Sequence, residues 1–277
     1  YRYDGSSNFG PDNRWAGFHS VAAAWRFSNE KFFAGIQNII NNGKLRLGWG
    51  QTGNANIGGY KWGSPMDVME SDFGTSYRPK QIANTGIKWE TQEQWNVGLD
   101  LNFLNNRINF IADAYIKTSK DMLMALQLPT YMGSSEITNT SARLDPPFGN
   151  YGEIRNKGIE LELRVLPFVG EFEWETDFQI SFNKNELRKL SGTANAQIVG
   201  YGQYSDVVSV SEVGKPLYSF YGYVTDGVYK DYQDLLDSPK TEQYPEDGNF
   251  NKSNTVWVGD IKYKDISGPD GVPDGVI

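Results

Sequence analysis

Strict alternation of apolar and polar side chains over residues 171–183 constrains the fold more than any other feature of the sequence. One set of side chains is large and mostly apolar: Phe172, Trp174, Thr176, Phe178, Ile180 and Phe182. The other set is acidic or polar: Glu173, Glu175, Asp177, Gln179, Ser181 and Asn183. Because successive side chains of a strand point to opposite faces, this period predicts one long strand with an apolar and a wetted face.

The same alternation in neighbouring segments predicts two antiparallel hairpins. Residues 159–165 alternate between aliphatic and charged side chains, and only residues 168–170 separate them from the first strand. This tight connection keeps the two apolar faces on the same side. A second hairpin is predicted from residues 95–103 through a turn at 104–106 into residues 108–117. Residues 20–27 and 44–51 are two shorter strand candidates.

The connections between these strands alternate between short and long. The long ones span residues 52–90, residues 118–156 and the chain from residue 186 onward. Outer-membrane barrels place short turns on the periplasmic side and long loops outside. The apolar spacing of residues 30–42 predicts a short helix, which would form an unusual periplasmic turn.

Strand length decides between a membrane sheet and a soluble one. Half-buried sheets of soluble β-sandwiches also alternate with a period of two. The candidate strands, however, match the roughly 9–11 residues that cross hydrocarbon at a tilt and exceed the usual 5–6 of soluble sheets. Four tryptophans also lie at or near the predicted strand ends, as in interfacial girdles: Trp25, Trp49, Trp95 and Trp174. The sequence therefore favours an all-β transmembrane barrel.

Composition excludes several other classes. Hydrophobic residues make up 39% and aromatic residues 14% of the 277, a mixture that suits strands. The net charge of −8 argues against a nucleic-acid partner, which requires a basic surface. The absence of cysteine excludes disulfides and thiolate metal sites. No apolar run approaches the roughly 20 residues of a membrane helix.

Several motifs occur in an order that resembles the SusC/RagA family. Residues 4–15 read Asp-Gly-Ser-Ser-Asn-Phe-Gly-Pro-Asp-Asn-Arg-Trp, and residues 50–54 read Gly-Gln-Thr-Gly-Asn. The other matches, which extend the resemblance over nearly the whole chain, are residues 18–26, 44–46, 88–91, 96–100, 156–160, 220–223 and 259–265. Each motif alone is weak evidence, whereas the ordered set is specific.

Membership of this family would imply features that spacing alone does not establish. The family's proteins form barrels of about 22 strands, filled by an N-terminal plug and energised by TonB. A SusD-like lipoprotein closes the barrel from outside. We therefore expect residues 1–277 to be part of such a barrel in the outer membrane of a Gram-negative bacterium, in contact with the lipid bilayer. The plug and the TonB contact would lie before Tyr1, and the barrel-closing strands beyond Ile277.

Two sets of candidate site residues follow from this interpretation. Aromatic residues of the long connections are candidates for contact with substrate or partner: Tyr60, Trp62, Tyr77, Tyr131, Tyr151, Tyr201, Tyr204 and Trp257. Carboxylates of the polar strand face are expected to line the barrel interior: Glu160, Glu162, Glu173, Glu175 and Asp177. A catalytic carboxylate pair is the alternative, but these residues share their face with many other polar side chains. His19 is the only histidine, so it is the only residue that could serve as the histidine base of a catalytic triad.

The segment near Ile277 admits two interpretations. Oxygen ligands from Asp265, Asp270 and Asp274, together with Ser267, would suit Ca²⁺, the only cofactor that the sequence suggests. The spacing departs from the calcium-loop template and no glutamate follows, so a turn-rich loop is the other interpretation.

The sequence thus predicts a TonB-energised importer of a nutrient, either a glycan or an oligopeptide, and no enzyme. A soluble β-sandwich that binds glycans is the alternative, and loop aromatics would serve either function. A passive porin is a third hypothesis, which differs in its plug and its use of energy.

Overall fold

The computed structural model describes residues 1–126, 144–190, 197–203, 206–266, 268 and 272–277. The chain divides into two compact units. One comprises residues 1–198 and 211–219, and the other residues 199–210 and 220–277. The candidates Tyr131, Tyr204, Ser267 and Asp270 lie outside the described residues.

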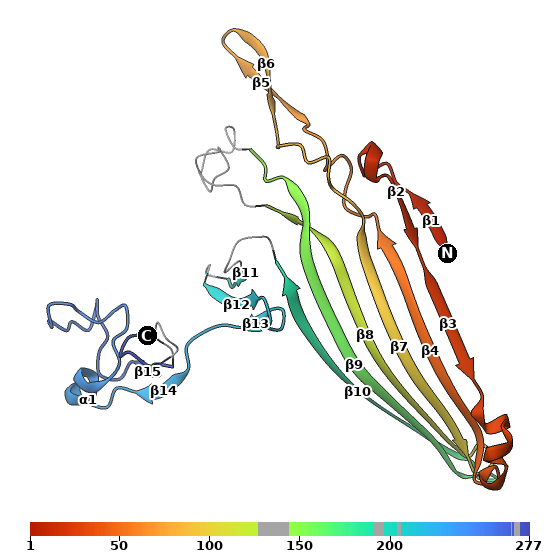
Figure 1. Ribbon diagram of the computed structural model, residues 1–277. Helices are drawn as coiled ribbons and strands as arrows, with labels where there is room; N and C mark the ends of the chain where they lie inside the picture. Colours follow the sequence, from red (N-terminus) through yellow and green to blue (C-terminus); the bar gives the residue numbers. More distant parts are fainter. Residues whose placement is uncertain (127–143, 191–196, 204–205, 267, 269–271) are drawn as a thin grey trace. The chain divides into compact units, whose positions relative to one another are not determined.

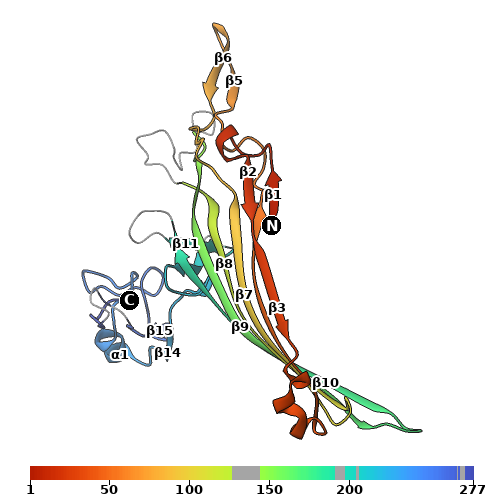
Figure 2. The ribbon, with the colours of Figure 1, turned by 45° about the vertical axis from the view of Figure 1, so that its right-hand side comes forward.

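The first unit is built on one antiparallel sheet of six strands in the order β10-β9-β8-β7-β4-β3 (Figure 1). All six lie side by side as a curved sheet in both ribbon views (Figure 2). Their bounds are β3 Ser20–Trp25, β4 Ile40–Asn54, β7 Glu90–Phe103, β8 Ile108–Ala125, β9 Phe148–Phe168 and β10 Trp174–Lys189. The alternating segments of the sequence are thus confirmed as neighbouring strands.

The register confirms that the apolar sides of these strands form one face. Rows of directly opposed residues run across the sheet, for example Leu47, Val97, Ala114, Ile159 and Phe182. The next row is Leu45, Leu99, Ala112, Leu161 and Ile180. We call this side the apolar face and the other side the polar face.

The dimensions of the apolar face suit a bilayer. Its side chains on β7 run from Trp95 to Phe103, about 27 Å along the strand at ~3.4 Å per residue. A strand tilt of about 40° reduces this to a height of about 21 Å, close to the ~25 Å apolar band of outer-membrane barrels. Trp49 and Trp95 lie opposite each other at the upper limit of the band, where both indole N–H groups donate to Glu93. The next residues on this face, Gln51 and Glu93, are polar.

The short connections differ in detail from the prediction. Residues 104–106 form the β7–β8 turn as expected, all with positive φ. The β9–β10 connection spans residues 169–173 and is longer than expected, because β10 begins only at Trp174. Glu173 therefore lies in the turn and not on the strand, and Glu175 lies at an irregularity of the register.

The helix predicted over residues 30–42 is wrong. Two 3₁₀ segments, η2 (Phe27–Asn29) and η3 (Lys31–Ile36), occupy this connection, and β4 begins at Ile40. Gly35 and the β-branched Ile36, Ile39 and Ile40 disfavour an α-helix, and the chain must return directly to an adjacent strand. The rings of Phe27 and Phe33 contact each other edge to face, with their centroids 5.3 Å apart, and Phe27 fills the space beside Gly43 on β4.

Shorter elements complete the first unit. A hairpin of β1 (Arg2–Gly5) and β2 (Trp15–Phe18) brackets the 3₁₀ turn η1 (Pro11–Asn13), and a second hairpin pairs β5 (Met66–Ser71) with β6 (Gly74–Pro79). Three further short strands, β11 (Gln197–Tyr201), β12 (Val207–Glu212) and β13 (Ser219–Phe220), pair in that order, and each includes residues assigned to both units.

The second unit has a small core of its own. Tyr229, Leu235 and Val256 are buried together, with Tyr244 and Phe250 packed against them. Its elements are β14 (Thr225–Val228), α1 (Tyr232–Asp237) and β15 (Ile261–Tyr263), and β14 pairs with β15. Asp231 caps α1 by accepting the backbone N–H of Asp234 at 2.8 Å. Within the described part of the chain, no helix combines the length and apolar character needed to cross a membrane.

Candidate functional site

Charged side chains on the polar face form two ion-paired groups. On β4, Arg46 donates to Asp100 of β7 through Nε at 3.0 Å and Nη2 at 2.7 Å, and its Nη2 also reaches Asp113 of β8 at 3.0 Å. Near the β9–β10 turn, Arg164 contacts Glu175 at 3.0 Å and Asp177 at 2.8 Å. These contacts join neighbouring strands and fix the positions of the charges along the polar face.

Arg46 reaches the second strand because Gly98 lies between them. Gly98 is the β7 residue opposite both Arg46 and Asp113. A Cβ atom there would lie 2.6 Å from Cζ of Arg46 and even closer to the carboxylate of Asp113. The absence of a side chain at Gly98 therefore lets one guanidinium serve two strands. This network was missed by the sequence analysis, although its residues all lie at polar positions of the alternation.

We expect Gly98→Ala to lower the free energy of unfolding by about 1 kcal/mol, since it displaces Arg46 from a partly exposed ion pair and crowds the face. Gly48→Ala is the matched control on the adjacent strand, because the nearest atom to its added Cβ is Cβ of Asn96 at 3.9 Å. Urea unfolding of both variants measures the difference. Equal stability of the two variants would contradict the role assigned to Gly98.

Two of the predicted wall carboxylates lie beside a hollow in the polar face. Asp113, Glu160, Glu162, Gln179 and Ser181 contribute to its lining, and its volume is about 490 Å³. Glu160 lies opposite Asp113 and Ser181, and Glu162 opposite Ile111 and Gln179. Neither glutamate forms an ion pair with another described residue, in contrast to Glu175 and Asp177. Among the described residues, no group of three or more His, Cys, Asp or Glu side chains is arranged to hold a metal ion.

The two long connections of the first unit meet at the same end of the sheet. The backbone N–H of Asp145 donates to the carbonyl of Lys80 at 2.7 Å, and the Asn84 amide donates to the carbonyl of Phe148 at 2.7 Å. Gln81 is buried and donates to the carbonyls of Lys61 and Gly63. The prediction that these connections share one end is thus confirmed for the first unit. The prediction for residues 186–277 stays a prediction, because most of this segment belongs to the second unit.

A buried aromatic cluster anchors these connections to the sheet. Phe9, Phe18, Ile87 and Trp89 form it, and the rings of Phe9 and Trp89 stack at 5.1 Å. Phe18 occupies the space beside Gly53 of the 50–54 motif. The Asn8 amide donates to the carbonyl of Ala55 at 2.8 Å. Residues 4–15 and 50–54 therefore contribute to packing. From the sequence alone, Phe9 was part of a family motif, and no structural role was predicted for it.

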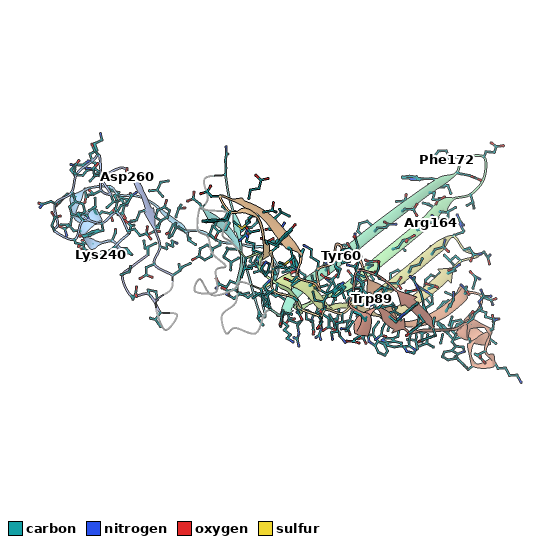
Figure 3. All side chains as sticks on the ribbon, turned by 90° about the horizontal axis from the view of Figure 1, so that it is seen from above. Tyr60, Trp89, Arg164, Phe172, Lys240 and Asp260 are labelled. Atoms are coloured by element: carbon teal, nitrogen blue, oxygen red, sulfur yellow. The ribbon has the colours of Figure 1, made fainter. Side chains whose placement is uncertain are left out.

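The candidate aromatics occupy several different environments. Tyr60 and Tyr77 are exposed on the 55–89 connection, Tyr77 on β6. Trp62 packs against the buried cluster, and its indole nitrogen is buried without a hydrogen-bond partner. Tyr151 lies within β9 and not in a loop, because β8 and β9 extend well beyond the apolar band. The loop assignment of Tyr151 was therefore wrong. In Figure 3, Tyr60 and Trp89 lie toward one end of the sheet, and Arg164 and Phe172 toward the other.

In the second unit, Tyr201 is exposed, and the backbone N–H of Trp257 donates to Asp260 at 2.8 Å. The carboxylate of Asp234 accepts the backbone N–H of Lys230 and pairs with Lys262 at 2.9 Å, and both interactions lower the pKa of Asp234. The candidate calcium ligands Asp265 and Asp274 accept the backbone N–H groups of Gly275 and Val276. These hydrogen bonds suit a turn-rich segment, and calcium binding stays a prediction. Figure 3 marks Lys240 and Asp260 in this unit.

Comparisons with known proteins agree with this architecture. The family model described as TonB dependent receptor-like, beta-barrel matches residues 1–257. The TonB-dependent receptor SusC of Bacteroides thetaiotaomicron is 35% identical over 85% of this chain and 23% of its own length. The TonB-dependent receptor P39 of Formosa agariphila is 32% identical over 83% of this chain and 20% of its own length. The chain thus spans about a quarter or less of these relatives.

Two solved structures share the fold. The RagAB peptide transporter aligns with a TM-score of 0.68 at 27% identity, over 82% of this chain and 23% of that one. The RagAB peptide importer in its open-open state aligns with a TM-score of 0.70 at 26% identity, over 87% of this chain and 26% of that one. The six-stranded sheet is a portion of an antiparallel transmembrane β-barrel, and the chain belongs to the TonB-dependent receptor family as a SusC/RagA-like segment.

Proposed function

We propose that this chain is part of an outer-membrane importer that takes up a nutrient with energy from TonB. The observation that carries the proposal is the unequal pair of faces on one sheet of six strands. Large apolar side chains such as Phe178 and Phe182 are 58% and 59% exposed on one side. A soluble sandwich would bury such a face, whereas a bilayer covers it.

The polar face is proposed to line the barrel interior. Ion pairs fix Arg46 and Arg164 on this face, and Glu160 and Glu162 border the hollow between β8, β9 and β10. A wall of this kind offers charges and amides to water, to a plug or to a passing solute. Among the described residues, Glu160 and Glu162 lie in an open and mostly polar hollow, which does not mark either for proton transfer, so the proposal includes no enzymatic activity.

A SusD-like lipoprotein is the proposed partner at the end of the sheet that carries the long connections. The sequence resemblance implies it, and the RagAB peptide transporter shares the fold. The exposed rings of Tyr60 and Tyr77 suit a recognition surface there, because tyrosine supplies rigid contact area at low entropic cost. The nutrient is proposed to be a glycan or an oligopeptide, and RagAB is itself named as a peptide transporter.

Co-purification tests the partnership. The full-length transporter, extracted in mild detergent, is expected to retain the lipoprotein, and hydrogen exchange at residues 55–89 is expected to slow in the complex. Strand amides of β7 serve as the internal control, because they are hydrogen-bonded with or without the partner. A transporter that purifies alone and shows no slower exchange when the lipoprotein is added would contradict the partnership, while its recovery with membranes would still support the barrel.

A further inference from the structure

Two lysines lie directly opposite each other on the apolar face of the sheet. Lys184 of β10 pairs in register with Lys157 of β9, and Lys157 is also opposite Ile116 of β8. They are the next residues on this face after Ile159 and Phe182, on the side toward the long connections. Like charges directly opposite each other destabilise a sheet. An arrangement of this kind is stabilised when an anion lies between the two ammonium groups.

No described carboxylate lies within ion-pair distance of this pair. Both lysines are exposed, and neither forms an ion pair within the described part of the chain. The next residue on the same face of β9 is Arg155, whose Nε is buried without a hydrogen-bond partner. Glu186 lies opposite Arg155, accepts from Arg188 at 2.9 Å, and also interacts electrostatically with Arg155 and Lys157. Lys157, Lys184 and Arg155 outnumber Glu186 here, so the surface just beyond the apolar band carries a net positive charge on these two strands.

An apolar groove adjoins the two ammonium groups. Its volume is about 390 Å³, and on this face it is lined by Ile116, Lys157, Ile159, Phe182 and Lys184. Ile159 and Phe182 are 50% and 59% exposed, so nothing else in the described residues covers them fully. Hydrocarbon at one end and cations at the other match an amphiphile that carries an anionic head group.

We propose that this groove binds a phosphorylated lipid of the leaflet nearest the long connections. An acyl chain lies over Ile159 and Phe182, and the phosphate lies between the ammonium groups of Lys157 and Lys184. Lysine suits this role because its compact, strongly hydrated charge binds phosphate without a fixed geometry. The inference rests on the proposed membrane location, and it adds a specific lipid site to a general lipid-facing surface.

Lipid binding to the full-length protein in neutral detergent tests the site. Native mass spectrometry compares phosphatidylglycerol with phosphatidylcholine of the same acyl chains, and inorganic phosphate serves as a third ligand. The wild type is expected to prefer phosphatidylglycerol, and Lys157→Gln/Lys184→Gln to weaken its binding roughly 10- to 30-fold. The control Lys44→Gln/Lys117→Gln removes two lysines from the polar face and is expected to leave lipid binding unchanged.

Three results would overturn the inference. The first is equal affinity of the wild type for the two lipids. The second is an equal loss of phosphatidylglycerol affinity in the two double variants. The third is binding of inorganic phosphate as tight as that of phosphatidylglycerol. Recovery of each protein with the outer-membrane fraction is measured first. A wild type absent from that fraction contradicts the proposed function, whereas an inserted wild type without lipid preference contradicts only the lipid site.

Discussion

Replacing Phe9 with alanine is expected to destabilise the anchoring of the long connections by about 3–5 kcal/mol. Phe9 is completely buried, stacks on Trp89 and belongs to a cluster that includes Phe18 and Ile87. The change removes most of a ring from the point where the N-terminal segment, the 55–89 connection and the sheet meet. Because the strands retain their own hydrogen bonds, the substitution lowers the free energy of local opening of the connections more than it lowers the stability of the sheet.

Hydrogen exchange in the full-length protein measures this effect. The amide of Ile87, which donates to the carbonyl of Asn84, is expected to exchange at least about 100-fold faster in Phe9→Ala, since each 1.4 kcal/mol changes an equilibrium tenfold. Tyr60→Ala is the control, because it removes an exposed ring from the same connection. Similar exchange rates in the two variants would show that the cluster does not hold the connections in place.

Replacing Ile180 with arginine is expected to lower the free energy of unfolding of the membrane-inserted protein by about 2–4 kcal/mol. Ile180 lies in the row of Leu45, Leu99, Ala112 and Leu161, within the apolar band. A guanidinium at this depth must be desolvated or must distort the bilayer to reach water. Arginine at the neighbouring Ser181, on the polar face beside Glu160, is expected to cost little.

Urea unfolding in vesicles of the two arginine variants gives the comparison. The assignment of the faces predicts a much larger loss for Ile180→Arg than for Ser181→Arg. Equal losses would mean that the two faces meet the same environment, and a larger loss for Ser181→Arg would reverse the assignment.

The parts of the fold that the sequence predicted are those determined by local alternation. Side chains with a period of two place residues such as Leu99 and Ile180 on one face, and the asparagines of the 104–106 turn tolerate positive φ. Both signals are short-range, so the strands, their order within hairpins and their faces follow from them.

Other features depend on contacts that alternation does not report. β8 continues to Ala125 through an irregularity at Asp121, whose φ is 56°. The alternation of side chains between the two faces is interrupted there, although the strand continues. Tyr151 was assigned to a loop for the same reason. The Arg46 network requires three strands in register, and the second unit has its own core around Tyr229. None of these shows in a single stretch of sequence.

Cysteine scanning along β10 tests the central claim most directly. The chain contains no cysteine, so each substitution adds one defined thiol to it. In the full-length protein in outer membranes, Phe178→Cys, Ile180→Cys and Phe182→Cys are expected to resist a water-soluble maleimide, whereas Gln179→Cys, Ser181→Cys and Asn183→Cys react. An alternating pattern that disappears when the protein is unfolded in urea supports one face in lipid and one in a wetted interior. Uniform reactivity along residues 178–183, or protection of the polar-face positions instead, would contradict the barrel.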